Sequence, residues 1–178
     1  MIPQHYIIPI GLPGSLCICP RLRGDDWLED EIKGFKDLGF TNIICLLTDD
    51  EELLLGLEHQ DIICERLGVK FLKLPVEDRS KPLTHKDFLG VALDTFQRLE
   101  AGECVAVYSR RGTGRTAIFC SSVLYFYGMY PEESLEVIET ARGLCVPDTE
   151  LQKEWILKLD NWVEGLTDLL IDSRGLPG

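Results

Sequence analysis

The chain has 178 residues, 45% of them apolar, which is enough to bury one substantial core, so we expect a single globular domain. Its 30 acidic and 18 basic residues give a formal net charge of -12, which argues against nucleic acid and anionic membrane surfaces as partners. Seven cysteines, an odd number placed mostly within apolar segments, indicate reduced, core-filling thiols and a cytoplasmic location.

The N-terminal stretch 1–16 is apolar, but three prolines and two glycines interrupt it and it lacks a basic start. We therefore expect neither a signal peptide nor a membrane helix there. Residues 16–19 predict a short strand, and its cysteines, Cys17 and Cys19, have no second cysteine or histidine pair at ligand spacing. No metal site or other cofactor is expected. The loop 20–24 carries two arginines that could face a ligand, although solvated surface is the ordinary role of such residues.

Between residues 25 and 101, helical and strand patterns alternate along the chain. A helix is predicted over 27–38, capped by Asp25 or Asp26 and closed by Gly39. Strands alternating with helices imply parallel pairing through right-handed crossovers. The sequence therefore predicts an α/β fold of three layers, in which helices flank a central, mostly parallel sheet of four or five strands. The other predicted elements are strand 42–47 with a helix cap at 48–50, helices 51–57 and 60–67, strand 69–74 and helix 84–101.

A strand, a loop and a helix follow in residues 104–127. Residues 104–108 predict a strand buried on both faces, and 116–127 carries apolar residues at helical intervals until Gly128. Between them lies the sequence Ser-Arg-Arg-Gly-Thr-Gly-Arg. In such an arrangement the loop amides and the unpaired amides of the helix start converge, and the helix dipole adds positive potential. The segment therefore predicts an anion-binding cradle.

The charges of this loop agree with an anionic ligand. It contains three arginines and no carboxylate although the chain as a whole is acidic, which favours a small anion such as phosphate. Arg115, at the helix start, can hold two phosphate oxygens with its guanidinium. Gly112 and Gly114 permit backbone angles and a close approach that side chains forbid. The predicted phosphate-binding residues are Ser109, Arg110, Arg111, Gly112, Thr113, Gly114 and Arg115.

Two nucleotide-binding patterns share this strand–loop–helix plan, and both fit poorly. Residues 112–117 match the dinucleotide pattern G-x-G-x-x-G/A, but three residues separate the first glycine from the strand. The acidic candidates about 20 positions further on, Glu132 and Glu133, open another predicted helix instead of ending a strand. The nucleotide-triphosphate pattern requires a lysine after its last glycine, where this chain has Arg115.

The spacing from position 109 to Arg115, followed by Thr116, resembles the signature His-Cys-x5-Arg-Ser/Thr of the cysteine-dependent protein tyrosine and dual-specificity phosphatases. In that family the cysteine attacks phosphorus, the arginine holds the phosphoryl oxygens, and the following hydroxyl steadies the thiolate. The resemblance implies catalytic roles for position 109, Arg115 and Thr116. Two positions depart from the signature: Tyr108 replaces the histidine, and Ser109 replaces the nucleophilic cysteine.

Ser109 decides what chemistry the loop can perform. A cysteine at a helix start has a pKa well below about 8.5 and is a thiolate at neutral pH, whereas a serine hydroxyl needs an adjacent base. None of the three histidines lies near in sequence, so we expect phosphoryl binding with little or no turnover. The sequence leaves open whether Ser109 is a natural replacement or one introduced to trap substrate, although only a natural loss also explains Tyr108.

The loop 75–82 holds a second candidate residue. In the phosphatase family a loop aspartate ahead of the nucleophile strand protonates the leaving oxygen, and Asp78 resembles this residue in order and context. General-acid help of this kind is worth about 10²–10⁴ in rate. An isolated loop aspartate is more often a turn residue bonded to its own backbone. The position of Asp78 relative to the phosphate loop reverses that preference, and Glu77 is the fallback.

A third candidate stretch, 146–152, lies ahead of and at the start of a helix predicted over 150–166. It resembles the phosphatase element Gln-Thr-x-x-Gln, whose glutamines position the attacking water. Asp148 replaces the first glutamine, and Thr149 and Gln152 are retained. Gln152 is therefore a candidate for catalysis. Asp148 or Thr149 is a good cap for the helix predicted over 150–166.

The resemblance covers 16–162, nearly the whole of a single phosphatase-like domain over 1–166. It includes a helix predicted over 131–141, and the compact branch near the kinase-associated phosphatases is the most similar. The tail 167–178 loses periodicity, and we expect it to fray.

Two functions of different classes follow from this resemblance. In the first, the chain derives from enzymes that hydrolyse phosphotyrosine, phosphoserine or phosphothreonine, and a cysteine at position 109 would restore activity. In the second, the natural protein has Ser109 and is a pseudophosphatase that binds phosphopeptides or acts as a scaffold. A third option is a fold retained for protein contact alone. The predicted partner is a phosphorylated protein or peptide, with phosphate or sulfate in the loop.

Overall fold

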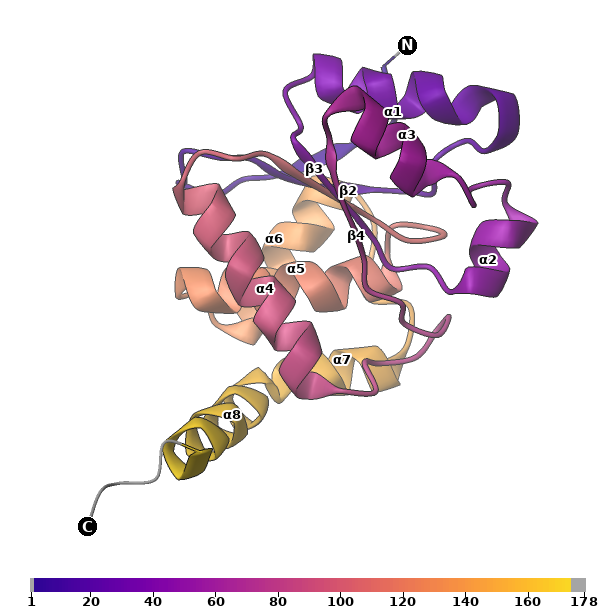
Figure 1. The fold of residues 1–178 in the computed structure, drawn as a ribbon. Helices are drawn as coiled ribbons and strands as arrows, with labels where there is room; N and C mark the ends of the chain where they lie inside the picture. The colour runs from indigo at the N-terminus through magenta and orange to yellow at the C-terminus, as the bar shows by residue number, and fades with distance from the viewer. Residues whose placement is uncertain (1, 174–178) are drawn as a thin grey trace.

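The computed structural model describes residues 2–173; residues 1 and 174–178 lie outside the described part of the chain. Five strands form one sheet in the order β1-β2-β5-β3-β4 (Figure 1). β1 is antiparallel to β2, and the other neighbouring pairs are parallel. This confirms the predicted α/β fold with a mostly parallel sheet. The strands are β1 (Tyr6–Ile8), β2 (Leu16–Cys19), β3 (Asn42–Cys45), β4 (Lys70–Lys73) and β5 (Val105–Tyr108).

Helices cover both faces of the sheet. α1 and α3 pack together on one face, and α4, α5 and α6 lie on the other (Figure 1). α2 and the start of α7 lie near the edge at which the parallel strands end, and α8 extends away from the sheet (Figure 1). The helices are η1 (Asp25–Trp27, a 3₁₀ turn), α1 (Leu28–Asp37), α2 (Asp49–Leu54), α3 (Gln60–Leu67), α4 (His85–Glu100), α5 (Gly114–Tyr127), α6 (Pro131–Arg142), α7 (Glu150–Leu157) and α8 (Leu159–Ser173).

The three central strands are buried throughout because their side chains alternate between two cores. On β5, Val105 and Val107 join the core beneath α4 and α5, whereas Ala106 and Tyr108 join the core beneath α1 and α3. This explains why these strands read as unbroken apolar runs. The edge strand β1 was not predicted, because it has only three residues in a proline-rich stretch and its central Ile7 is exposed.

One predicted helix cap is confirmed and another is wrong. Thr48 caps α2 through a reciprocal capping box with Glu51. Neither Asp25 nor Asp26 caps a helix: η1 follows Gly24, and no side chain caps η1 or α1. Asp25 has a φ of 51°, and its amide donates to the carbonyl of Gly56 at 2.9 Å. The chain is therefore held here by a loop-to-loop contact that the helical pattern does not contain.

The C-terminal helix also differs from its prediction. The expected single helix over 150–166 is interrupted at Lys158, whose φ and ψ of -101° and 15° end α7 and precede α8. α8 continues to Ser173, beyond the predicted end at residue 166, and the fraying of the tail 167–178 stays a prediction, with residues 174–178 outside the described part of the chain. Residues 167–173 contain no glycine or proline, so no helix-breaking residue ends α8 before Ser173.

All seven cysteines are free, and five of them are buried in the two cores, which confirms the prediction of core-filling thiols. Among the side chains that the structure describes, those of residues 2–166, no group of three or more His, Cys, Asp or Glu is arranged to hold a metal ion. No helix in the described part of the chain is long and apolar enough to span a bilayer.

Candidate functional site

The predicted phosphate loop connects the end of β5 to the start of α5, next to the carboxyl end of β2. Gly112 has a φ of 65°, and a Cβ at this position would lie 2.5 Å from the carbonyl oxygen of Cys19. A Cβ on Gly114 would lie 2.5 Å from Oδ2 of Asp148. Gly112 is therefore required by its backbone conformation and by the close approach of the β2 backbone, whereas a side chain at Gly114 would displace the ends of the Asp148 and Gln152 side chains.

The backbone of this loop directs its amides and carbonyls to different partners. Within residues 2–173, the amide of Gly112 donates to Oγ of Ser109 at 3.3 Å, and the other amides from 110 to 116 have no protein acceptor. The carbonyl of Arg110 accepts from the amide of Arg21 at 3.3 Å. Free amides at a helix start form an anion-binding arrangement.

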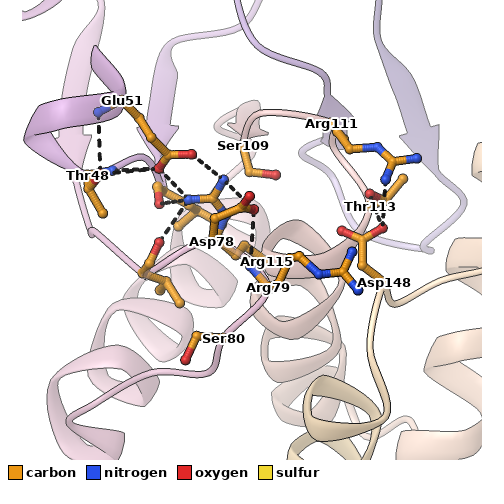
Figure 2. Close-up of polar contacts among 12 residues, drawn as sticks. Thr48, Glu51, Asp78, Arg79, Ser80, Ser109, Arg111, Thr113, Arg115 and Asp148 are labelled. Carbon is orange, nitrogen blue, oxygen red and sulfur yellow. Dashed lines mark hydrogen bonds and ion pairs between the residues drawn. The ribbon is translucent and has the colours of Figure 1, made fainter. Parts of the chain in front are cut away.

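Arg115 lies buried at the base of the loop, with 2% of its surface exposed. Its Nη1 and Nη2 donate to the two carboxylate oxygens of Glu51 at 2.6 and 2.8 Å (Figure 2). Nη1 also donates to the carbonyl of Val76 at 2.8 Å, and Nη2 lies 3.2 Å from Oδ1 of Asp78. No acceptor among the described residues takes the Nε hydrogen. The guanidinium is thus fixed on one side and available to a ligand on the other.

Glu51 is a partner of Arg115 that the sequence analysis missed. Burial on its own would raise the pKa of Glu51, but hydrogen bonds from Arg115 and from the amide of Thr48, together with the charge of Arg115, hold this pKa below its ordinary value. The capping box with Thr48 also orients the carboxylate. The only sequence signal was Thr-x-x-Glu, which predicts the cap but not the ion pair.

Asp78 reaches the site from the loop after β4. Its side chain is about half exposed, and Oδ1 accepts a hydrogen bond from the amide of Arg79 at 3.1 Å while lying 3.2 Å from Arg115 (Figure 2). The residue therefore bonds its own backbone and borders the phosphate loop at the same time. Glu77, the fallback candidate, is exposed and makes no ion pair within the described chain.

The stretch 148–152 packs against the other side of the loop. Asp148 accepts a hydrogen bond from Oγ1 of Thr113 at 2.7 Å, and its Oδ1 lies 4.0 Å from Nη1 of Arg111 (Figure 2). Gln152 is fully buried, shares a capping box with Thr149, and donates to the carbonyl of Ser80 at 3.0 Å. Gln152 thus joins α7 to the Asp78 loop beside the phosphate loop.

Three hydroxyl residues at the loop are buried: Thr113, which bonds Asp148, and also Ser109 and Thr116. Ser109 is 2% exposed, and its side chain points between the Arg115–Asp78 group and the Thr113–Asp148 group (Figure 2). Oγ1 of Thr116 is buried without a hydrogen-bond partner among the described residues. Arg110 and Arg111 differ from these residues, because their side chains are exposed at the rim.

Comparison with known proteins identifies the fold. No family model matches this sequence, and no curated protein sequence matches it. Kinase-associated phosphatase with serine substituted for its catalytic-site cysteine gives a TM-score of 0.82 at 14% identity, over 92% of this chain and 97% of that chain. PTPMT1 in complex with PI(5)P gives 0.72 at 18% identity, over 92% and 98% of the two chains. The human tyrosine phosphatase-like serine/threonine/tyrosine-interacting protein gives 0.69 at 18% identity, over 90% and 97%.

The chain has the protein tyrosine phosphatase fold. At these identities the likeness establishes the fold, and the chemistry depends on the residues that this chain places in it. The phosphatase fold brings the loop 109–115, Asp78 and Gln152 together at the carboxyl ends of the parallel strands, although these residues are up to 74 positions apart in sequence.

Arg142 is, after Glu51, the second residue at the site that the sequence analysis did not predict. It comes from the last turn of α6, where its Nε donates to the carbonyl of Gly112 at 2.7 Å and its Nη2 to that of Arg111 at 3.2 Å. Its guanidinium stacks on Tyr6, 3.9 Å from the ring centroid. Because Arg142 binds the carbonyls of Arg111 and Gly112, the amides of the residues that follow them point in the opposite direction, away from Arg142. A lone arginine at a helix end carries no sequence signal for this role.

Tyr108 faces away from the phosphate loop, into the core beneath α1 and α3. Its hydroxyl donates to Oε1 of Gln60, whose Nε2 donates to Glu52 at 2.6 Å. Burial raises the pKa of Tyr108 well above its ordinary value, so the phenol is neutral. A buried tyrosine with a satisfied hydroxyl shows that position 108 fits its phosphatase fold without a histidine.

Proposed function

We propose that this chain is a phosphatase-family domain that binds phosphomonoesters of proteins in the loop 109–115 and turns them over little or not at all. The observation that carries the proposal is the arrangement of Arg115. Its guanidinium is buried and fixed by Glu51, and its Nε side is available next to a loop in which, apart from the amide of Gly112, the amides have no acceptor among the described residues. Charge-assisted hydrogen bonds of this kind are the stronger ones in proteins and suit a tetrahedral dianion.

Turnover requires a nucleophile, and no described residue is placed to activate Ser109 as one. A serine hydroxyl must lose its proton to an adjacent base before it attacks phosphorus. No histidine among the described residues hydrogen-bonds Ser109: His85 accepts from Trp155 at 3.1 Å, His5 packs among aromatic rings, and His59 precedes α3. The nearby carboxylate of Glu51 is bound by Arg115 and has a lowered pKa, which weakens it as a base, and the carboxylate of Asp78 is directed at Arg115 at 3.2 Å.

The remaining residues keep the roles that the phosphatase resemblance implies. Asp78 would protonate a leaving oxygen in an active form, Thr116 would support the group at position 109, and Gln152 would position water. The unpartnered hydroxyl of Thr116 supports this reading, because a buried group without a hydrogen bond is costly unless a ligand uses it. With Ser109 in place, these residues contribute to binding.

Tyr108 favours a natural pseudophosphatase over an introduced serine. Replacing one residue to trap substrate would leave its neighbour unchanged, whereas this chain differs from the family signature at both positions. The hydroxyl of Tyr108 is also satisfied by Gln60, so the change at position 108 is accommodated by the surrounding core.

The test compares binding and turnover in the same preparation. We expect a phosphotyrosine or phosphothreonine peptide, but not its unphosphorylated form, to bind by isothermal titration calorimetry, with no phosphate released. Arg115→Lys should lower the affinity at least about tenfold, because a lysine cannot make the paired hydrogen bonds. Binding that is indifferent to phosphorylation and to Arg115→Lys would support a fold retained for protein contact alone.

Restoring the cysteine separates the two classes of function. Ser109→Cys, followed by Tyr108→His in the same chain, should produce hydrolysis of p-nitrophenyl phosphate if the site is a disabled enzyme. If the double variant still binds phosphate and remains inactive, the binding-module function gains support.

A further inference from the structure

The charge around the phosphate loop is unevenly distributed. Arg115 is already paired with the carboxylates of Glu51 and Asp78, and these two groups compensate much of its positive charge before a ligand binds. Four exposed arginines lie in the loop or in the segments next to it, and only one of them has a carboxylate within 4.0 Å in the described chain, the weak Arg111–Asp148 pair. These rim arginines are Arg21, Arg79, Arg110 and Arg111. In a chain of net charge -12, such unpaired cations indicate an anionic ligand that extends beyond one phosphoryl group.

One of these rim arginines lines a pocket. The pocket has a volume of about 360 Å³, and its Arg21 is joined to the phosphate loop because the amide of Arg21 donates to the carbonyl of Arg110 at 3.3 Å. Its two basic residues are Arg21 and Arg23, and Glu31 is its only acidic residue. The complete lining is Ile2, Gln4, Pro20, Arg21, Arg23 and Glu31.

The two arginines of this pocket are held differently. Arg23 is fixed in place: its Nε and Nη2 lie 2.7 and 2.6 Å from Oε1 of the buried Glu31, and its guanidinium lies 5.2 Å from the ring of Trp27. Arg21 has no carboxylate partner among the described residues. Since Glu31 and Arg23 compensate each other, the net charge of the pocket is that of Arg21, while Nη1 of Arg23 has no partner among the described residues and can donate to a ligand.

We propose that the ligand carries a second anionic group next to its phosphomonoester, and that Arg21 and Arg23 bind this group in the pocket that they line. This inference rests on the proposed function. The chemistry that fits is a polypeptide whose phosphorylated residue is flanked by an aspartate, a glutamate or a second phosphorylated residue. Apolar and amide groups from Ile2, Pro20 and Gln4 line the same pocket and suit peptide side chains. The strongly acidic molecule repels an extended anionic surface, which disfavours a lipid bilayer as the source.

The experiment uses three phosphotyrosine peptides that differ only in the flanking residues: two aspartates, two asparagines, or one phosphoserine. We expect the two acidic peptides to bind about tenfold more tightly than the neutral peptide, which corresponds to about 1.4 kcal/mol. Arg21→Gln should remove this preference without changing the affinity for inorganic phosphate. Arg66→Gln, at an exposed arginine on α3, is the matched control and should leave the preference intact.

Arg23 requires a paired substitution, because its removal alone would leave the buried Glu31 without a partner. Arg23→Gln combined with Glu31→Gln should reduce the preference in the same way. Equal affinity of the wild-type chain for all three peptides would overturn the inference and leave the proposed function intact. If none of the peptides binds, the proposed function fails first and the inference fails with it. Tighter binding of a soluble inositol bisphosphate than of any peptide, lost in Arg21→Gln, would overturn the peptide assignment.

Discussion

The ion pair between Arg115 and Glu51 shows how single residues prepare this site before any ligand arrives. Both side chains are nearly buried, with exposed fractions of 2% and 11%. A buried pair of charges is costly to form, and it is still more costly to break by removing one partner. The pair lies beside the phosphate loop, and its two hydrogen bonds fix the orientation of the Arg115 guanidinium.

The first prediction concerns this pair. Glu51→Gln leaves the guanidinium without its bidentate carboxylate, so we expect a loss of about 3 kcal/mol in the free energy of unfolding, measured by denaturant titration. The affinity for phosphate should also fall, because Arg115 loses its orientation. A variant as stable as the wild-type chain would show that the pair is not structurally important. Lys73 supplies a control: Lys73→Met breaks a more exposed ion pair with Glu52 and should cost less.

Gly112 gives the second prediction, with Gly68 as a matched control. Both have positive φ, 65° and 71°, but a Cβ on Gly68 meets no atom within 4 Å, whereas one on Gly112 meets the carbonyl of Cys19. We expect Gly68→Ala to cost about 1 kcal/mol, from the left-handed conformation alone. Gly112→Ala should cost more and also weaken phosphate binding. Equal losses in thermal unfolding would show that the contact with β2 is unimportant.

Much of the site at the residue scale follows from the sequence, and what was missed has a common cause. The glycines and Arg115 were predicted because they lie within a short pattern of fixed spacing, and Asp78 was predicted from its order and context relative to that pattern. Glu51 and Arg142 were not, because their partners are 64 and 30 residues away and the contact exists only in the folded chain. Local patterns predict local geometry; ion pairs between elements depend on the packing of the whole sheet.

At the scale of elements, three segments converge on the loop and hold it from different sides. α2 supplies Glu51, the start of α7 supplies Asp148 and Gln152, and the end of α6 supplies Arg142. Two of these segments begin with capping boxes, which fix the first turns that carry the contacting residues. The loop is therefore shaped by helix termini that its own sequence does not include.

Arg142 gives the third prediction. Arg142→Leu keeps the apolar stem but removes both hydrogen bonds to the loop carbonyls, and each bond to a charged group is worth about 1.5–3 kcal/mol. We expect the affinity for phosphate to fall roughly tenfold while the far-ultraviolet circular dichroism remains that of the wild type. Arg66→Leu, in a surface ion pair on α3, should bind phosphate normally. Unchanged affinity in Arg142→Leu would remove this residue from the site.

The order of elements was predicted more reliably than their ends. The alternation of helices and strands predicts the parallel sheet, because strands buried on both faces and amphipathic helices leave different periodicities. The break at Lys158 and the loop contact at Asp25 are set by neighbouring segments, so no periodicity reveals them. The short edge strand β1 is defined by its pairing with β2 and has no pattern of its own.

For the whole molecule, the fourth prediction is the dependence of stability on pH. Burial, with a smaller contribution from the charge of Lys81, lowers the pKa of His85 below its ordinary value of 6.5. Its ring also accepts a hydrogen bond from Trp155, which requires the neutral form. His85 therefore contributes stability above pH 6.5, and the contribution is lost as the pH falls through the lower pKa of the folded state.

Glu51 adds a second, more acidic window. Its pKa is lowered from 4.5 in the folded chain, so its contribution is present above pH 4.5 and is lost as the pH falls through the folded pKa. We expect the free energy of unfolding to decrease in two steps on acidification. His85→Gln should remove the first step and Glu51→Gln the second, so that each variant is the control for the other. A profile that is flat between pH 7 and pH 5 would contradict the role of His85.

The central claim is that an anion binds where the amides of residues 110–116 converge beside Arg115, and a titration with inorganic phosphate followed by amide nuclear magnetic resonance tests it most directly. We expect the largest shifts at Arg110–Thr116 and at the Nε resonance of Arg115, and small shifts at the opposite end of the sheet near residues 39–42. A folded spectrum in which the loop amides do not respond to phosphate, or in which the response lies elsewhere, would contradict the account.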